Sequence, residues 1–314
     1  MELHLSISVV IPTKNRCSDL TRCLDSLLAQ SVKPAEIIVV DNESSDDTVF
    51  LNEKYPEVRF LRNHVPNIPR SLNLGWQFTR SDYIAFLNDD TQVPSTWIEE
   101  LSHWLSILSD FGAMGGPTID MRRRVQAELL HKKSFWLLFY DKFMMDSELL
   151  EFGRLNEWGG YSIGNEYPSV PTQVQTLTVT NMMIKRNLLE ELNGFDEDFN
   201  FSNYDGMLFI LMNRLKKKMY FIPITPVLHF VNPLGSTRSP YFLARDYAIF
   251  YSKLMPMTLQ ERMKLRFNEL FFVLSWLLRS DSDRCRVFLS AIQGFLSGID
   301  YIRRKSTMNT IEKQ

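Results

Sequence analysis

The strongest constraint on the fold of this chain is a repeated change of hydrophobic period in its first third. Short runs that are apolar or nearly so, at 7–11, 37–40 and 83–87, alternate with segments such as 20–28, where leucines recur at i, i+4, i+7 and i+8. Continuous apolar runs are typical of strands buried on both faces, and the second spacing is typical of an amphipathic helix. The alternation therefore predicts an α/β fold with a mostly parallel sheet flanked by helices.

The rest of the chain predicts further strands and helices, then an irregular stretch and a helical C-terminal region. The expected strands are 58–61, 111–116, 176–179, 220–222 and 227–229, and the expected helices are 69–79, 94–108, 187–192 and 206–215. The stretch from 117 to 175 is irregular and rich in aromatic residues. After Pro240 the pattern is mostly helical.

Composition excludes several classes of protein. The 314 residues are 45% hydrophobic and 23% charged, which is ordinary for a globular chain and argues against disorder. The formal net charge of −2 lacks the basic excess of a nucleic-acid binder. Cys17, Cys23 and Cys285 form neither a disulfide framework nor a zinc spacing, so we expect free thiols in a reducing compartment.

The sequence also predicts no export signal and no membrane-spanning helix. The N-terminus lacks a basic segment followed by an apolar one. The apolar stretch at 270–278 is much shorter than the ~20 residues that span a bilayer. We therefore expect a cytoplasmic protein.

Common nucleotide and hydrolase motifs do not occur in the sequence. It has no G-x-x-x-x-G-K-[ST] phosphate loop, and no G-x-G-x-x-G follows the first predicted strand. The G-x-S-x-G and H-E-x-x-H motifs are also missing. The acidic stretch at 41–47 fails the EF-hand spacing.

Polar residues follow the predicted strands at the edge where parallel sheets bind ligands. Asn88, Asp89 and Asp90 come directly after the apolar run 83–87. Adjacent carboxylates repel each other, and a divalent cation with oxygen ligands would relieve this and bind a diphosphate. A solvated turn before Pro94 explains the same residues and stays open.

Three other polar positions also carry two interpretations. Asp41 could hold a base or ribose, or the stretch 41–47 could cap the next helix through Ser44, Ser45 or Asp46. His229 could be a ligand or a structural histidine. Asp205, taken alone, reads as a helix N-cap.

Five segments, in this order, resemble the motifs of the family-2 glycosyltransferases of the GT-A fold. They are residues 8–16, 36–48, 73–75 with 82–90, 194–199 with 204–205, and 226–229. They are similar, respectively, to the opening strand with its nucleotide loop, the base-contacting loop, the metal-binding D-x-D element, the acceptor segment that ends in the catalytic base, and a strand whose histidine completes the metal site. A rhamnosyltransferase-like subgroup also fits this resemblance.

The resemblance implies a Rossmann-like sheet with a helical C-terminal extension. Residues 1–116 would form the nucleotide-sugar-binding half, 117–235 the acceptor half and 236–314 the helical region. The implied nucleotide contacts are Pro12, Thr13, Asn15, Arg16, Asp41, Asn42, Arg70, Asn73, Asn88 and Asp89. Asp90 and His229 would hold a divalent cation, Mn²⁺ or Mg²⁺, and Asp205 would be the base of an inverting transfer.

Two positions depart from the family pattern. Asn88 replaces the first aspartate of the D-x-D element, although an amide still bonds a ribose hydroxyl. Tyr204 replaces the usual glutamate before the base, which leaves the orientation of Asp205 undetermined.

The resemblance further implies the reactants. The donor would be a UDP-, dTDP- or GDP-linked sugar, and the acceptor a saccharide, with a lipid-linked one favoured, in cell-surface polysaccharide or glycoconjugate synthesis. The apolar, basic-flanked stretch 262–279 predicts either a helix on the inner face of the cell membrane or a buried helix that packs internally or in a homo-oligomer. The alternative functions are a sugar nucleotidyltransferase and a nucleotide-sugar-binding protein without efficient transfer.

Overall fold

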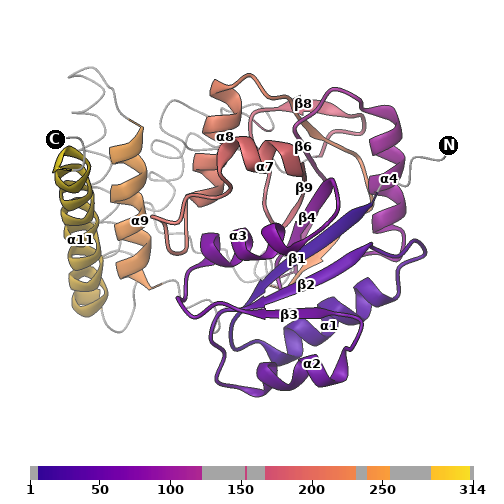
Figure 1. The fold of residues 1–314 in the computed structure, drawn as a ribbon, viewed down its shortest axis with the longest axis horizontal. Coiled ribbons are helices and arrows are strands. Elements are labelled where there is room, and N and C mark those ends of the chain that lie inside the picture. Colours follow the sequence, from indigo (N-terminus) through magenta and orange to yellow (C-terminus); the bar gives the residue numbers. More distant parts are fainter. Residues whose placement is uncertain (1–5, 122–152, 154–166, 231–238, 255–283, 312–314) are drawn as a thin grey trace, which may run out of the picture.

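The computed structural model describes residues 6–121, 153, 167–230, 239–254 and 284–311. Their core is an eight-stranded mixed sheet with helices on both faces (Figure 1). The strand order is β3-β2-β1-β4-β9-β6-β10-β8. The strands are β1 (Ile7–Thr13), β2 (Glu36–Asp41), β3 (Arg59–Arg62), β4 (Tyr83–Leu87), β6 (Ala113–Gly115), β8 (Thr172–Val174), β9 (Asn181–Lys185) and β10 (Met219–Phe221).

The N-terminal half of the sheet is parallel, as the apolar runs predict. β1 pairs with β2 on one side and β4 on the other, and β2 pairs with β3. The order reverses beside β1, which is the point where such sheets form a ligand crevice. β9 then runs antiparallel between β4 and β6.

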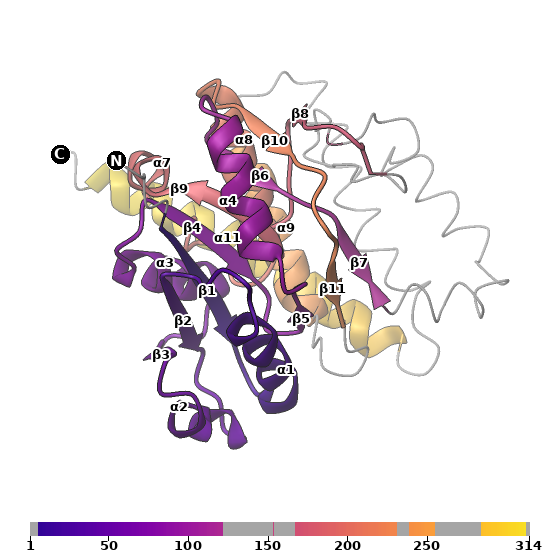
Figure 2. The ribbon, with the colours of Figure 1, turned by 90° about the vertical axis from the view of Figure 1, so that its right-hand side faces the viewer.

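Helices cover both faces because the strand side chains alternate between two apolar layers (Figure 2). One layer packs on α1 (Cys17–Leu28) and α4 (Trp97–Ile107), through residues such as Leu24 and Trp97. The other packs on α3 (Ile68–Phe78), α7 (Arg186–Leu192) and α8 (Tyr204–Arg214), through residues such as Trp76 and Phe209. A short 3-10 helix, η1 (Asp47–Phe50), and α2 (Leu51–Lys54) connect β2 to β3.

A second, three-stranded sheet lies at the carboxyl end of β4. β11 (Val227–His229) runs between β5 (Thr91–Gln92) and β7 (Thr118–Asp120). In this ladder His229 is the partner of Thr91, and the N–H of Phe230 donates to the carbonyl of Asp90 at 2.7 Å. The small sheet therefore joins distant parts of the sequence beside the acidic end of β4.

Two helices follow the sheet domain. α9 (Pro240–Lys253) lies between the sheet body and α11 (Arg284–Ile311) in Figure 1. The two helices pack closely side by side, and a Cβ at Gly294 would stand 1.9 Å from the carbonyl oxygen of Tyr241. Within the described residues no helix is long and apolar enough to cross a bilayer. The stretch 262–279 lies outside these residues.

Most of the predicted elements are confirmed, with shifts of a few residues at their ends. The strand expected at 176–179 is wrong: it forms no strand, and β8 and β9 lie on either side of it. The first strand also continues through Pro12, whose missing N–H the parallel ladder tolerates at that position. Cys23 is a buried free thiol and Cys17 a half-buried one, as expected.

Candidate active site

The acidic pair that follows β4 is buried and tied to the loop after β1. Asp89 and Asp90 are 8% and 5% exposed. The hydroxyl of Thr13 donates to Asp89 Oδ2 at 2.8 Å, and Arg16 Nη1 donates to Asp90 Oδ2 at 2.8 Å. The Nε of Arg16 lies 3.8 Å from Asp89 Oδ1. A turn surrounded by water is therefore the wrong interpretation of these carboxylates.

The remaining oxygen of Asp90 faces His229. Its buried Oδ1 lies 3.0 Å from His229 Nε2, an ion pair when the imidazole is protonated. The amide of Asn88 lies 3.4 Å from the same histidine nitrogen and donates to Thr180 Oγ1 at 3.2 Å. His229 is thus part of the cluster at the end of β4.

The two carboxyl groups differ in their acidity. Burial, together with the neighbouring charge of Asp90, raises the pKa of Asp89 to about 7, and Arg16 and Thr13 only partly oppose this. Burial also acts on Asp90, but His229 and Arg16 outweigh it and hold the pKa of Asp90 below its ordinary value. Asp90 is therefore the carboxylate that stays ionised.

These residues fit a divalent cation shared with a ligand. The buried Asp90 Oδ1 and the adjacent His229 Nε2 are atom types that ligate metal ions in proteins. No group of three or more His, Cys, Asp or Glu side chains in the described part of the chain could hold a metal by itself. A cation bound by one or two protein groups and completed by phosphate oxygens is the usual arrangement for Mg²⁺.

The loops after β1 and β2 are locked to each other. Asn15, in the left-handed region with φ 53°, accepts from the N–H of Ser45 at 2.7 Å, and its own N–H donates to Ser44 Oγ. Asp41 Oδ1 accepts from the N–H of Ser44 at 3.0 Å. Asp46 is the N-cap of η1, so the capping interpretation of this stretch is correct for Asp46.

Three residues predicted to contact the nucleotide have side chains that bond to other parts of the described chain and not to the carboxylate cluster. The side-chain Oδ1 of Asn42 accepts from Asn63 Nδ2 and from the N–H of Asn67. Asn73 donates to the carbonyl of Phe195 at 2.8 Å, within the predicted acceptor segment. Arg70 is half exposed and pairs with Glu197 at 3.4 Å. Among the described residues no interaction joins Asn73 or Arg70 to the carboxylate cluster.

Asp205 lies in the first turn of α8, not at its N-cap. The N-cap is Asn203, with φ 61°, which corrects the helix-cap interpretation of Asp205. The Oδ1 of Asp205 accepts from the N–H of Gly206 at 2.8 Å, and burial raises the pKa of Asp205. No interaction links Asp205 with Asp90 among the residues that the structure describes.

Aromatic contacts nevertheless bring the start of α8 toward β4. Tyr204 packs edge-on against Phe195 at 5.9 Å between ring centroids, and Phe195 packs edge-on against Phe86 of β4 at 5.2 Å. Phe86 lies two residues before Asn88. Tyr204 therefore packs the turn that carries Asp205 against the sheet.

Sequence reasoning missed the residues that hold this arrangement together. Asn67 is the N-cap of α3, and its Nδ2 also donates to the carbonyls of Phe199 and Glu197, at 2.6 and 3.2 Å. Thr180, the partner of Asn88, lies in a stretch with no recognisable motif. Helix-cap preference could have identified Asn67, but nothing in the sequence indicated its long-range partners.

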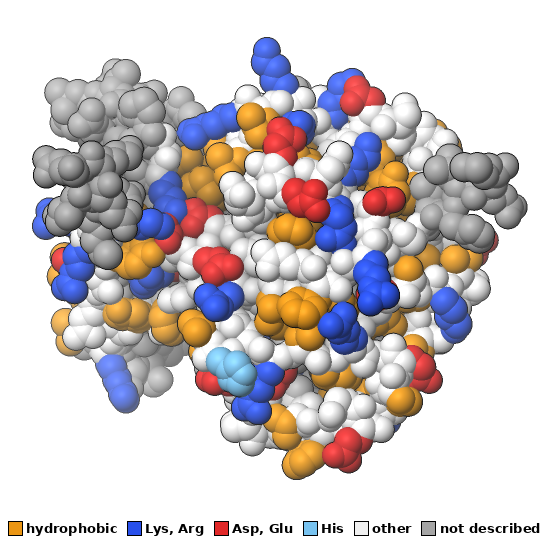
Figure 3. Space-filling view, viewed as in Figure 1, with side chains coloured by type: hydrophobic (Ala, Val, Ile, Leu, Met, Phe, Trp, Pro, Cys, Tyr) orange, Lys and Arg blue, Asp and Glu red, His pale blue; other side chains and the backbone are white. Residues whose placement is uncertain are grey.

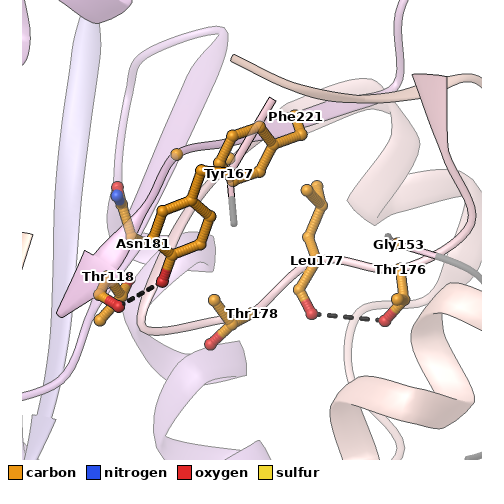
Figure 4. A pocket seen from close by; sticks show the side chains of 10 residues that line it. Thr118, Gly153, Tyr167, Thr176, Leu177, Thr178, Asn181 and Phe221 are labelled. Atoms are coloured by element: carbon orange, nitrogen blue, oxygen red, sulfur yellow. Dashed lines mark hydrogen bonds between the residues drawn. The ribbon is translucent and has the colours of Figure 1, made fainter. Parts of the chain in front are cut away.

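A separate cavity lies between β6, β7, β9 and β10 (Figure 4). Tyr167 stacks on Phe221 at 5.4 Å, and its hydroxyl donates to the Thr118 carbonyl at 2.6 Å. The lining of the cavity is mainly apolar, with Leu177 and Phe221 among the lining residues. We assign no substrate to this cavity.

The surface gives no indication of nucleic-acid binding on the face seen in Figure 3. Over the described part of that face, basic and acidic side chains are interspersed. A nucleic-acid footprint is instead a stripe or patch of one sign.

We compared the chain with known proteins by sequence and by fold. The chain is 25% identical over 256 residues to the O-antigen biosynthesis protein RfbC of Myxococcus xanthus, which covers 80% of this chain and 19% of that protein. This chain spans less than a third of the length of the first curated relatives that it matches.

Two solved structures share the fold. The structure of S. aureus TarS 1–349 in complex with UDP-GlcNAc has a TM-score of 0.58 at 13% identity, covering 93% of this chain and 81% of that one. The mannosyltransferase PcManGT from Pyrobaculum calidifontis, in complex with GDP-Man and Mn²⁺, has a TM-score of 0.53 at 14% identity, covering 98% and 80%. The predicted GT-A fold, with its helical C-terminal extension, is thereby confirmed.

The model of the family described as glycosyl transferase family 2 matches residues 8–192. That match covers more than half of the chain, and so the chain belongs to glycosyl transferase family 2.

Proposed function

We propose that this chain is a glycosyltransferase that moves a sugar from a nucleoside-diphosphate sugar to a hydroxyl of a saccharide acceptor, with inversion at the anomeric carbon. The observation that carries the proposal is the meeting of Asp90 and His229 at the carboxyl end of β4, where the buried Asp90 Oδ1 lies 3.0 Å from His229 Nε2. Ligands of such sheets bind at this edge. Residues 1–116 would supply the donor half and 117–235 the acceptor half.

The names of similar proteins support the choice of donor and process. TarS was crystallised with UDP-GlcNAc, and PcManGT with GDP-Man and Mn²⁺. The Myxococcus relative is named for O-antigen biosynthesis. We therefore propose a UDP-, dTDP- or GDP-linked donor, a saccharide acceptor that is lipid-linked, and a role in cell-surface polysaccharide synthesis.

Asp90 and His229 would hold the divalent cation, Mn²⁺ or Mg²⁺. When bound there, the cation supplies positive charge for the diphosphate that leaves. Arg16, which pairs with Asp90 Oδ2 at 2.8 Å, is a second source of positive charge for the phosphates.

The loops after β1 and β2 would hold the nucleoside. Thr13 and Asp41 are register partners on adjacent strands, so they present their side chains to the same crevice end. We assign these two residues to the base, and Asn88 or Asp89 to the ribose hydroxyls. Asn15 and Asn42 then act by fixing the loops, since their side chains bond to other loop residues.

Asp205 would be the general base. Its carboxylate takes the proton of the acceptor hydroxyl while that oxygen forms a bond to the anomeric carbon and the bond to the diphosphate oxygen breaks. The raised pKa of Asp205, caused by burial, makes it a stronger proton acceptor than an exposed aspartate. A single displacement of this kind inverts the anomeric centre.

Thermal unfolding in the presence of a panel of nucleotide sugars tests the proposal. Ligands that bind only the folded state raise the unfolding temperature with concentration. We expect UDP-, dTDP- or GDP-sugars to stabilise the chain more with Mn²⁺ than without it. A panel in which no nucleotide sugar stabilises the chain under either condition would count against the donor site.

A further inference from the structure

We propose that Asp246, on α9 of the C-terminal helical region, is a positioning residue that fixes the loop before α8 and so presents Asp205 to the acceptor. The inference rests on the proposed function and adds to it a role for the C-terminal helices. Asp246 is 0% exposed and lies outside every motif of the site.

The carboxylate of Asp246 caps three consecutive backbone N–H groups. Its Oδ2 accepts from Phe201 at 2.7 Å, Ser202 at 2.9 Å and Asn200 at 3.1 Å, and its Oδ1 accepts from Asn200 at 3.1 Å. A buried carboxylate is costly unless hydrogen bonds and charge compensate it. Arg245 Nη1 supplies that charge, 3.0 Å from Asp246 Oδ1.

The capped loop leads directly into the turn of the proposed base. Asn203 follows in the left-handed region, and α8 begins at Tyr204, one residue before Asp205. A loop whose N–H groups converge on one carboxylate has few alternative conformations. Fixing residues 200–202 therefore fixes the direction in which α8 starts.

The other end of the same loop is held by both C-terminal helices. Asp198 pairs with Lys253 of α9 at 2.5 Å and with Lys305 of α11 at 2.6 Å, and it accepts from the Tyr301 hydroxyl at 2.6 Å. Arg245 donates to the Asp198 carbonyl at 3.0 Å. Residue 198 is therefore bound by side chains of α9 and α11, and residues 200–202 are bound by Asp246 of α9.

Apolar packing joins α8 and the loop to α9 as one unit. Phe199 and Met207 are buried in a cluster with Ile249 and Phe250 of α9. On its opposite side the loop is bonded to α3, where Asn67 Nδ2 donates to the Phe199 carbonyl at 2.6 Å. The loop therefore lies between the donor half, through α3, and the C-terminal helices.

The substitution Asp246→Asn tests the inference with the whole chain. An amide keeps the size of the side chain but removes its charge and turns one acceptor into a donor that faces N–H groups. We expect kcat for transfer to fall about 10- to 100-fold, while the dissociation constant of the nucleotide sugar stays within about twofold, as for a group that acts only on the attack step.

The matched control is Asp300→Asn, on α11. Asp300 pairs with Arg304 of its own helix at 2.7 Å and is about half exposed. The substitution makes the same chemical change in the same helical region without touching the loop. We expect its kcat and donor affinity to equal those of the wild type. Asp246→Glu, which keeps the charge, should recover part of the activity.

Hydrogen exchange separates the failure of this inference from failure of the proposed function, because it needs no substrate. We expect the amides of residues 200–207 to exchange faster in Asp246→Asn than in the wild type and in Asp300→Asn. Unchanged exchange, or faster exchange with an unchanged kcat, would overturn the positioning role. A wild type that neither binds nor turns over any nucleotide sugar would overturn the proposed function instead, and the catalytic part of this inference with it.

If Asp246→Asn fails to fold, Asp246→Glu is measured in its place. The added methylene displaces the carboxylate from the three N–H groups, so we expect the same pattern at smaller amplitude. A Glu variant with wild-type kcat and faster exchange at 200–207 would contradict the inference.

Discussion

The Nε2 of His229 lies 3.0 Å from Oδ1 of Asp90, although the two residues are far apart in the sequence. The β5–β11 ladder creates this contact: β5 begins directly after Asp90, and its Thr91 is the register partner of His229. The contact is therefore fixed by backbone pairing and does not depend on side-chain choice alone.

The first prediction concerns the cation. Asp90→Asn removes the charge that His229 and Arg16 face, and an amide is a weaker ligand than a carboxylate for a divalent cation. We expect Mn²⁺-dependent stabilisation by the nucleotide sugar to be lost in thermal unfolding. Asp110→Asn is the control, since Asp110 is exposed and pairs only with Lys218 among the described residues. Equal Mn²⁺ dependence in both variants would show that Asp90 does not bind the metal.

The second prediction concerns the pH dependence of turnover. A general base must be ionised, and burial raises the pKa of Asp205 above the ordinary 3.8. The kcat of the donor-saturated enzyme should therefore fall with decreasing pH through an apparent pKa above 3.8. A pH–kcat profile measures this, and a profile that stays flat down to pH 4 would remove Asp205 from the role.

The third prediction concerns the packing of α3 on the sheet. A Cβ at Gly75 would lie 2.3 Å from Val10 Cγ1, so Gly75→Ala forces the helix away from β1. We expect the free energy of unfolding to fall by about 1–3 kcal/mol, the usual cost of overpacking a core. Urea denaturation measures this loss.

Gly206→Ala is the matched comparison. A Cβ at Gly206 would meet Phe250 at an ordinary contact distance of 3.6 Å, inside α8. The same change should therefore raise the free energy of unfolding by about 0.4–1 kcal/mol. Equal effects at Gly75 and Gly206 would show that the close approach of α3 to β1 is not as described.

The fourth prediction concerns acid stability. Although burial opposes its ionisation, hydrogen bonds from Lys253, Lys305 and Tyr301 lower the pKa of Asp198 to about 2. Because the folded pKa is below the ordinary 3.8, the ionised group stabilises the fold above pH 4, and this contribution declines as the pH falls toward 2. Asp198→Asn should cost about 1–3 kcal/mol at pH 7.

Chemical denaturation of wild type and Asp198→Asn at several pH values provides the measurement. The difference between their free energies of unfolding should be constant from pH 7 to about 5 and shrink below pH 4. A difference that grows on acidification would mean that Asp198 is not ionised in the folded protein.

The sequence predicted the parallel half of the fold well because its central strands are mostly apolar and are followed by polar residues. Tyr83 to Leu87 forms β4 as expected, and the acidic residues after it are clustered at the crevice end. The sequence placed a strand at 176–179, but the strand in this region is β9, Asn181–Lys185. The apolar run in β9 is short, and the residues before it also alternate with apolar ones, so the pattern did not locate the strand.

The candidate site was predictable only where local sequence determines position. Thr13, Arg16 and Asp90 follow strands whose order could be inferred, so their convergence was foreseeable. The roles of Asn42 and Asn73 as internal hydrogen-bond partners were not, because those bonds join residues far apart in the chain. Asp246 could not be recognised either, since a single aspartate in a helix carries no local signal for the loop it caps.

The most direct test of the account is the release of nucleoside diphosphate from the donor that stabilises the chain best, measured with Mn²⁺ and a saccharide acceptor. Wild type and Asp110→Asn should release it at equal rates. Asp205→Asn should be slower by about 10²- to 10⁴-fold while binding the donor equally well. Absence of release by the wild type with every donor, or equal release by Asp205→Asn, would contradict the account.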